Sequence, residues 1–331
     1  MENIFKVDNA IKQEYLDEKP TDTAKSDMFV LRAVDNYEYL IGQSVYNMTY
    51  SELNEMIAMQ FKNSSVKSIL KNVSVLKTYI DFCVGKKFVN HGENRLAIFT
   101  IKEAKKFVSK QALLNKCITK EKLEEYKKIL YNPQDQLLLE LPFIGVRGRT
   151  VKEGTLEEII NLTIDDVDKK NNILTLTQNN GTQRPLKVED STIELIEDVY
   201  EQEFYVENNG VQTNNPRFSD PRELKINKVE HYIYRVPSKD KVDIFNPNIL
   251  NSRMRKMQIW LDNMYINFTG LYQSGMLNMA KNIYKEKGEI EKEDYTEICR
   301  IYNYGSGDPE KYWWNLRSLF EQYRELFKND F

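Results

Sequence analysis

The clearest periodic pattern of apolar and polar positions lies in the stretch "SVKSILKNVSVLKTYIDFCVGKK". Its apolar residues recur every three or four positions, at Val66, Ile69, Leu70, Val73, Leu76, Ile80, Cys83 and Val84. This spacing follows one face of a 3.6-residue period for about five turns and predicts a long amphipathic helix. Gly85, followed by Lys86 and Lys87, suits the C-terminal end of such a helix.

Further helical patterns surround this segment. They are "MFVLRAVDNYEYLIGQ", "TYSELNEMIAMQF", which Thr49 or Ser51 can cap, and "TIKEAKKFVSKQALLNK". Residues 28–116 are therefore predicted to form a helical domain. Residues 1–27 are more polar, and Pro20 to Thr23 have the composition of a loop, so we expect a mobile N-terminal arm there.

The pattern restarts near Thr119, which can cap a helix over "KEKLEEYKKIL". The next segments predict a buried helix over "DQLLLELPFI", a helix and loop over "EGTLEEIINLTIDDVD", and a helix over "TIELIEDVYEQEF". "NILTLTQNNGTQRPLKV" alternates around Asn180-Gly181 and predicts a hairpin, in which Pro185 belongs on a sheet edge. Short strands are expected around "HYIYRV", and helices after Pro247. The fold class is thus mainly α with a small antiparallel sheet, in domains 28–116 and 117–331.

Composition excludes several classes of site. The chain has 331 residues, with three cysteines far apart and two histidines, His91 and His231. This pattern predicts no metal site, no disulfide framework and no Ser/His/Asp triad, and we expect no cofactor. No apolar run is long enough to span a membrane, and the acidic N-terminus lacks the features of a signal peptide. We therefore expect a cytoplasmic protein with no membrane partner.

Charge is unevenly distributed along the chain. The formal net charge is −3. Residues 44–116 carry twelve basic and five acidic side chains, whereas residues 1–43 carry five basic and nine acidic ones. A basic block inside an acidic chain is typical of a nucleic-acid contact, although a lysine-rich solvated surface gives the same pattern.

Candidate phosphate contacts lie on the polar face of the helix over residues 66–85. Lysines and hydroxyls recur there at helical spacing, and both types bind phosphate oxygens. The candidates in the basic block are Lys62, Lys67, Lys71, Ser74, Lys77, Thr78, Lys86 and Lys87. A plain solvent-exposed face remains the alternative.

From residue 29 to the last residue, the order of these elements resembles the tyrosine recombinase (phage integrase) family. The helical domain resembles the family's core-binding domain. "DQLLLELPFIGVRG" is similar to the buried helix and Thr-Gly-Leu-Arg turn that open its catalytic domain, and Glu158, Leu162 and Asp166 match the next segment. The resemblance implies a two-domain clamp on double-stranded DNA, in which a tyrosine attacks a phosphodiester. In that family, two arginines, a lysine and histidines stabilise the transition-state charge.

Several catalytic positions depart from the family pattern. Arg147 matches the first arginine, but the inserted octet from Gly148 to Thr155 separates it from Glu158. Amides, including Asn179, stand near the lysine position. Thr269 and Tyr272 replace His-x-x-Arg, and Ser306 replaces the second histidine. The nucleophile is expected at Asn315, whereas the nearest tyrosines are Tyr312 and Tyr323. Neither histidine in the chain is followed by an arginine three positions on, so a shifted alignment cannot restore His-x-x-Arg.

These departures predict an inactive recombinase that still binds DNA. Further candidate contacts are Arg147, Arg149, Lys152, Arg253, Arg255 and Lys256, each of which could instead be an ordinary surface cation. The preferred function is a transcriptional repressor that maintains phage lysogeny, located at the nucleoid of a bacterial host. Self-association or a protein regulator is compatible with this function. The alternatives are an active integrase with diverged motifs and an accessory DNA-bending protein.

Overall fold

The structure is a computed structural model, and it describes residues 4–61, 66–89, 91–108, 110–146, 156–211, 222–227, 231–235, 247–305 and 308–326. The chain divides into two compact units, Met1–Leu113 and Leu114–Phe331. We call them the N-terminal unit and the C-terminal unit, and we treat each by itself. No helix in the described ranges is long and apolar enough to cross a membrane.

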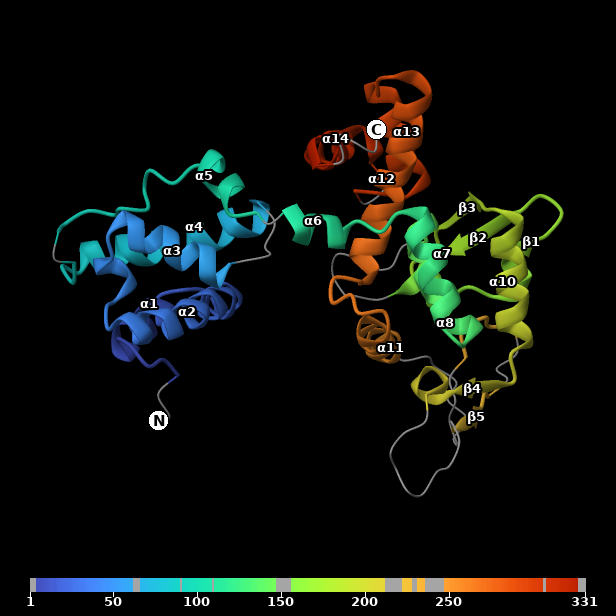
Figure 1. The fold of residues 1–331 in the computed structure, drawn as a ribbon, viewed down its shortest axis with the longest axis horizontal. Coiled ribbons are helices and arrows are strands. Elements are labelled where there is room, and N and C mark those ends of the chain that lie inside the picture. Colours follow the sequence, from blue (N-terminus) through green and yellow to red (C-terminus); the bar gives the residue numbers. More distant parts are fainter. Residues whose placement is uncertain are drawn as a thin grey trace. The chain divides into compact units, whose positions relative to one another are not determined.

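The N-terminal unit is helical (Figure 1). Its elements are α1 (Asn9–Asp17), α2 (Thr21–Ile41), η1 (Val45–Asn47), α3 (Tyr50–Gln60), α4 (Val66–Gly85) and α5 (Ile101–Lys106), and α6 (Lys110–Lys116) crosses into the next unit. Helix α4 is confirmed, and its predicted apolar face, including Ile69, Leu76 and Ile80, is buried in the core. Thr49 caps α3 in a capping box with Glu52, as its sequence predicts.

The prediction of a mobile arm over residues 1–27 is wrong for the part that the structure describes. Phe5 and Tyr15 are buried in the core, and the ammonium group of Lys12 is fully buried between Asp35 and Glu38 of α2. Pro20 precedes the first turn of α2, so "PTDT" begins a helix instead of forming a loop. The polar residues of this segment find partners that are distant in sequence, which local composition does not reveal.

The segment "TIKEAKKFVSKQALLNK" forms two helices, α5 and α6, where the pattern predicted one. Thr100 and Glu103 form a capping box that starts α5. The backbone N–H of Phe107 bonds to the carbonyl of Ala104, which is an i to i−3 bond that closes the short helix.

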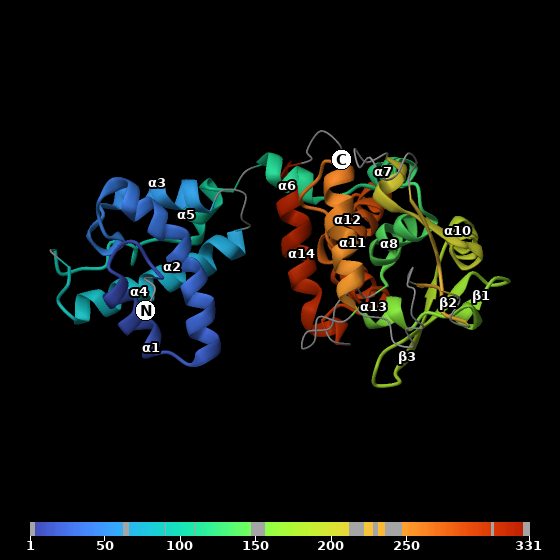
Figure 2. The same cartoon turned by 90° about the horizontal axis from the view of Figure 1, so that it is seen from below.

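Helix α8 (Pro133–Ile144) lies at the centre of the C-terminal unit (Figures 1 and 2). It contacts α7 (Lys120–Ile129), α10 (Asp190–Glu201), α11 (Pro247–Trp260) and α12 (Phe268–Lys287). The predicted burial of α8 is confirmed, because Leu137, Leu138, Leu139 and Leu141 have no exposed surface. Thr119 caps α7 through the N–H of Lys122, also as predicted.

The small antiparallel sheet has the strand order β1-β2-β3, with β1 at Val167–Asp168, β2 at Ile173–Thr177 and β3 at Gln183–Lys187. Pro185 of β3 pairs with Thr175, which places the proline on an edge strand as predicted. Before this sheet, the predicted helix shrinks to α9 (Glu157–Ile160), which is followed by η2 (Ile164–Asp166). The fold class, mainly α with a small antiparallel sheet, is confirmed.

A second, two-stranded sheet pairs β4 (Phe204–Val206) with β5 (Glu223–Lys225), and η3 (Glu207–Gly210) follows β4. The strands predicted around "HYIYRV" are reduced to a single bridge between Tyr232 and Thr163 in the described residues. After α12 come α13 (Lys292–Ile301) and α14 (Pro309–Leu326), which pack against each other and against α12 (Figure 1).

Candidate functional site

Thr269 and Tyr272 lie in the first turn and a half of α12. Asn267 caps this helix, because its side-chain oxygen accepts a hydrogen bond of 2.9 Å from the N–H of Gly270. Thr269 is exposed and Tyr272 is half-buried. A threonine hydroxyl and a phenol carry no positive charge at neutral pH, so neither side chain can offset a phosphate charge as His and Arg would.

The side chain of Tyr272 is bound inside the protein. Its hydroxyl donates to the backbone carbonyl of Tyr302, and the two rings meet edge to face with centroids 5.2 Å apart. The hydroxyl of Tyr302 in turn donates to the carbonyl of Phe143 at the end of α8, over 2.6 Å. Burial raises the pKa of Tyr302, which keeps this phenol in its neutral, donating form.

Gly275 of α12 allows this arrangement. A Cβ added at that position would lie 1.7 Å from the carbonyl oxygen of Phe143 and 2.5 Å from the hydroxyl of Tyr302. Such distances are far inside van der Waals contact, so α12 and α8 approach this closely only because residue 275 is a glycine.

Arg184 of β3 donates four hydrogen bonds to groups inside the C-terminal unit. Its Nε and Nη2 atoms donate to the two carboxylate oxygens of Glu158, over 2.9 and 2.8 Å, and Glu158 has no exposed surface. Nη1 donates to the carbonyl of Ile301 at 2.8 Å, and Nη2 donates to the carbonyl of Gly145 at 2.7 Å. Four of the five guanidinium N–H groups are therefore used inside the unit.

The hairpin turn that joins β2 to β3 carries amides and no cation. The N–H of Asn179 donates to a carboxylate oxygen of Glu157 at 2.8 Å, and the side chain of Asn161 donates to the Asn179 side-chain oxygen at 3.1 Å. A carboxylate therefore faces the turn, close to the position where the resemblance implies a lysine. Its negative charge opposes phosphate binding at this point.

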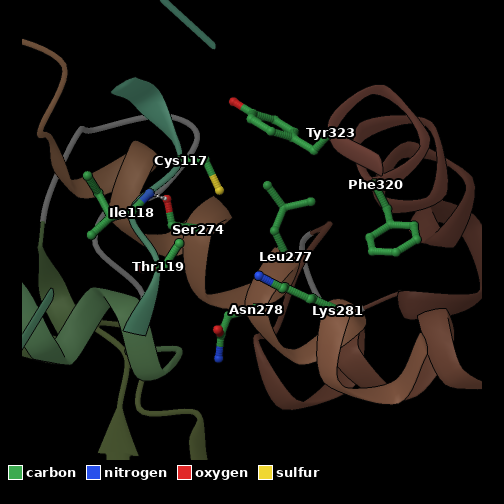
Figure 3. Close-up of a pocket in the computed structure, with 9 residues that line it drawn as sticks. All are labelled: Cys117, Ile118, Thr119, Ser274, Leu277, Asn278, Lys281, Phe320 and Tyr323. Atoms are coloured by element: carbon green, nitrogen blue, oxygen red, sulfur yellow. Dashed lines mark hydrogen bonds between the residues drawn. The ribbon is translucent and has the colours of Figure 1, made fainter. Parts of the chain in front are cut away.

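The two tyrosines nearest to the expected nucleophile lie in different environments. Tyr312 is 37% exposed, and its ring contacts the ring of Tyr304 and covers Gly305. Tyr323 is buried and lines a cavity of about 30 Å³ between α12 and α14 (Figure 3). Leu277 and Cys117 line the same cavity, and burial raises the pKa of both the Tyr323 phenol and the Cys117 thiol, the latter to about 12. The buried environment of Tyr323 therefore disfavours a phenolate nucleophile at that position.

The predicted phosphate-binding face of α4 is exposed. Lys67, Lys71, Ser74 and Thr78 all face solvent, opposite the residues that α4 buries. The hydroxyl of Thr78 donates to the carbonyl of Ser74 at 3.0 Å, which leaves its oxygen able to accept a further bond. The lysines and hydroxyls thus form a continuous exposed stripe, which we call the α4 stripe.

Two other cations of the basic block, Lys77 and Lys86, already have partners within the N-terminal unit. Lys77 donates to the carbonyls of Ala97 and Phe99, at 3.1 and 3.0 Å, and so holds a loop against α4. Lys86 pairs with Glu14 and Glu18 of the N-terminal segment, at 2.6 and 3.2 Å. The hydrogen bonds from Lys86 to these two carboxylates raise the pKa of Lys86. Lys87 is exposed, and Lys62 lies outside the described residues.

The prediction that Arg253 contacts DNA is wrong. Its side chain is buried, donates to the Gln134 side chain at 2.7 Å, and lies over the ring of Tyr205 at 4.3 Å. Asp135 adds an opposite charge at 3.9 Å. Arg253 occupies an inward position of α11, so its guanidinium serves the core of the C-terminal unit.

Arg255 and Lys256, on the outer face of α11, are exposed, and their contact with DNA stays a prediction. The remaining predicted positions lie outside the described residues, namely Arg147, Arg149, Lys152 and Ser306.

Sequence reasoning missed Arg184 and Tyr302. A signal for Arg184 was present, because β3 alternates and places residue 184 on the same face as buried Leu186. An arginine on the core face of a strand needs a buried partner, and Glu158 was available. Tyr302 had no comparable local signal, since its partners come from α8 and α12.

Comparisons with known proteins match both units. The family model described as "MrpR, C-terminal catalytic domain" matches residues 117–323, and "MrpR, N-terminal core-binding domain" matches residues 6–86. The SPbeta prophage-derived uncharacterized protein YopR of Bacillus subtilis (strain 168) is 22% identical over 294 residues, which cover 88% of this chain and 87% of YopR.

Among solved structures, the XerA recombinase aligns with a TM-score of 0.39 at 13% identity, covering 95% of this chain and 97% of XerA. A lambda integrase dimer bound to a COC' core site aligns with a TM-score of 0.45 at 12% identity, covering 93% of this chain and 77% of the integrase. The two family models cover most of the chain. The chain therefore belongs to the MrpR family, whose core-binding and catalytic domains are the two parts that the tyrosine recombinase resemblance implied.

Proposed function

We propose that this chain binds a specific double-stranded DNA sequence, represses transcription from phage DNA, and does not cleave the DNA that it binds. The observation that carries the proposal is the bonding of Tyr272. The residue at the position of the second catalytic arginine is a phenol, and its hydroxyl is engaged by the Tyr302 carbonyl. This position offers no charge to a phosphodiester.

The bonding of Arg184 supports the same proposal. Its guanidinium lies among α8, β3 and α13, and an arginine that bound a phosphate would need N–H groups free for the phosphate oxygens. Instead it donates to Glu158 and to the carbonyls of Gly145 and Ile301. Losing one transition-state donor typically costs about a hundred- to a thousandfold in rate, and here several donors are replaced together.

DNA binding rests on the exposed α4 stripe and on the family's core-binding domain, which is matched at residues 6–86. The repressor role rests on the missing chemistry, on the prophage origin of YopR, and on a resemblance to the master repressor of lysogeny in SPbeta-like temperate phages. A DNA-binding protein that cannot cut its site can still exclude other proteins from that site.

The test begins with pull-down of genomic DNA fragments, which identifies a bound site. The site is then prepared as a nicked duplex that traps covalent intermediates, with an active tyrosine recombinase on its own nicked site as the positive control. We expect a specific gel shift and no adduct that survives denaturation. A denaturation-resistant adduct that disappears in Tyr312→Phe or Tyr323→Phe would establish an active integrase instead.

A reporter gene placed downstream of the bound site separates a repressor from an accessory DNA-bending protein. We expect expression to fall at least severalfold when the protein is supplied, and to recover in a Lys67→Ala/Lys71→Ala variant that is present at the same level. Unchanged expression despite occupancy of the site would favour the accessory role.

A further inference from the structure

A groove of about 440 Å³ opens in the C-terminal unit, next to the small cavity that Tyr323 lines, and Asn278 contributes to both. Its walls are α7 and α8, the end of β3 with the start of α10, the middle of α12, and the end of α13. Figure 2 shows α8 between α12 and α10, both of which it contacts. The volume falls within the range of about 300–1,000 Å³ that is typical of small-molecule sites.

The floor of the groove is apolar. Ile144, Val188 and Ile301 are half-buried side chains that pack on the core from one side and line the groove from the other. Phe143 and Met279 extend this surface. A ligand that covered these side chains would gain about 25 cal/mol for each Å² of apolar surface removed from water.

One lysine at the rim is available to an anion. Two of the lining carboxylates, Glu124 and Glu140, already accept hydrogen bonds from Lys127, and Glu189 pairs with Lys120. Lys187 is exposed at the end of β3 and makes no ion pair with any residue that the structure describes. Its ammonium group is therefore available to a ligand, whereas each of the three carboxylates already has a lysine partner, with Lys127 shared between Glu124 and Glu140.

Two carboxamides of α12 add neutral hydrogen-bonding groups to this rim. Asn278 and Asn282 are four residues apart, so they lie on the same face of the helix, and both line the groove. Each can donate to an anionic oxygen or accept from a polar group of the ligand.

An extended peptide is a poor occupant, because the outer edge of β3 is blocked. The N–H of Val188 donates to the carbonyl of Asn172, and the N–H of Gln178 donates to the carbonyl of Thr182. Because hydrogen-bonded pairs alternate along an antiparallel ladder, the even-numbered residues of β3 point their N–H groups toward β2. Pro185 consequently stands on the outer edge, where it has no N–H to offer an added strand.

We propose that this groove binds a small organic anion, with an apolar body lying on Ile144, Val188 and Ile301 and a single acidic group at Lys187. The ligand is compact and does not extend the sheet. Charge complementarity at Lys187 and the apolar floor together select this class over a cation or a sugar.

The probe that tests the proposal is 8-anilinonaphthalene-1-sulfonate, which has an apolar body and one sulfonate. Its uncharged counterpart, N-phenyl-1-naphthylamine, has the same aromatic body without the sulfonate. Fluorescence titrations of the full chain with both probes measure the two affinities. They are made well below the melting transition, so that the probes do not bind a partly unfolded state. We expect one saturable site that prefers the sulfonate probe.

Two variants locate the site. Lys187→Glu should weaken the sulfonate probe by about fivefold or more and leave the uncharged probe nearly unchanged, because it replaces an attraction by a repulsion. Met279→Trp should weaken both probes on the order of tenfold, because the indole occupies the apolar volume. Lys285→Glu, an exposed position on the same α12 helix, is the matched control and should change neither probe.

Melting temperatures of all variants show whether each is folded. If Met279→Trp does not fold, the test rests on Lys187→Glu, which should fold because residue 187 is exposed. The ratio of its affinities for the two probes then decides whether Lys187 binds the acidic group. Equal affinity of both probes for the native chain, equal loss of both in Lys187→Glu, or retention of both in a folded Met279→Trp would overturn the proposal. Loss of probe binding in step with self-association at rising protein concentration would also overturn it, because the groove would then be an interface between copies.

Discussion

The α4 stripe and Arg184 are two cationic regions with opposite surroundings. On α4, Lys67 and Lys71 point into solvent from a helix whose other face fills the core. In the C-terminal unit, the side chain of Arg184 is 15% exposed, and its N–H groups donate to a buried carboxylate and two carbonyls. The same charge is thus exposed to solvent in one place and bound within its own unit in the other.

The difference shows why counting basic residues is a poor guide to a binding surface. Lys12, Lys77, Lys86, Arg184 and Arg253 are all cations, yet each has a partner within its own unit. An ion pair within the protein competes with a phosphate for the same N–H groups. The two regions differ in whether the N–H groups of their cations are free for an external partner, more than in their charge.

The largest effect is expected at Lys12, which is the most buried cation of the N-terminal unit. Lys12→Met should destabilise the protein by about 3–5 kcal/mol at neutral pH, because it leaves the carboxylates of Asp35 and Glu38 without their cation. Urea unfolding followed by circular dichroism measures the loss. Lys25→Met, at an exposed position of α2, is the control and should unfold like the native chain.

The pH dependence of this variant sharpens the point. Burial raises the pKa of Glu38, although Lys12 opposes the shift, so removing Lys12 should raise it further. A carboxyl group with a raised folded pKa takes up its proton in the folded state first, so stability returns as pH falls toward that pKa. We expect Lys12→Met to regain part of its lost stability as the pH falls from neutrality toward the raised pKa of Glu38.

In the native chain, Asp35 acts with the opposite sign to Glu38 and in a more acidic pH range, below the usual carboxyl pKa. Burial alone would raise the pKa of Asp35, but hydrogen bonds from Lys12 and from the backbone of Lys6 and Val7 lower it overall. A lowered carboxyl pKa contributes stability above the unfolded value, and this contribution is lost as pH falls through the folded pKa. Parallel pH profiles for the native chain and Lys12→Met would contradict this account.

A slightly smaller effect is expected at Arg184, which retains some exposure. Arg184→Met should cost about 3 kcal/mol of unfolding free energy, because the buried carboxylate of Glu158 loses the two hydrogen bonds and the opposite charge that Arg184 supplies. Adding Glu158→Gln to the same variant should restore part of the loss, because a neutral amide costs less to bury than a carboxylate. If Arg184→Met unfolds like the native protein, the guanidinium is not a structural cation.

The α4 stripe should respond in the reverse manner. Lys67→Ala/Lys71→Ala should leave the melting temperature nearly unchanged and weaken binding of specific and non-specific DNA alike, by up to about fivefold for each lysine. The slope of log affinity against log salt should flatten by up to about 0.9 for each lost contact, because fewer counterions are released. Binding isotherms at several salt concentrations measure both quantities, and an unchanged slope would remove α4 from the DNA interface.

The smallest effect is expected at Lys86, at the end of the same helix. Its ammonium group is already paired with Glu14 and Glu18, so Lys86→Ala should change DNA affinity and the salt slope far less than removal of Lys67. Titration beside Lys67→Ala on the same DNA gives the comparison. An equal loss in both single variants would show that ion pairing does not decide which lysine meets DNA.

The sequence by itself determined the elements whose causes are local. The period of α4, the caps at Thr49 and Thr119, and the turn at Asn180-Gly181 are set by residues within a few positions of one another, and each lies where its pattern predicted. The absence of His-x-x-Arg is also a sequence fact, because only two histidines exist and neither has an arginine three positions on.

Only the tertiary structure decided what each charged side chain does. The partners of Lys12, Arg184 and Arg253 are 23 to 119 positions away, and the N-terminal segment is ordered because Phe5 and Tyr15 find a core that other helices build. The burial and the ion pairing of a side chain depend on residues that folding brings close to it. The pattern of neighbouring residues in the sequence does not show which distant residues these are. The sequence therefore set where cations occur, and the fold set which of them remain available to a partner.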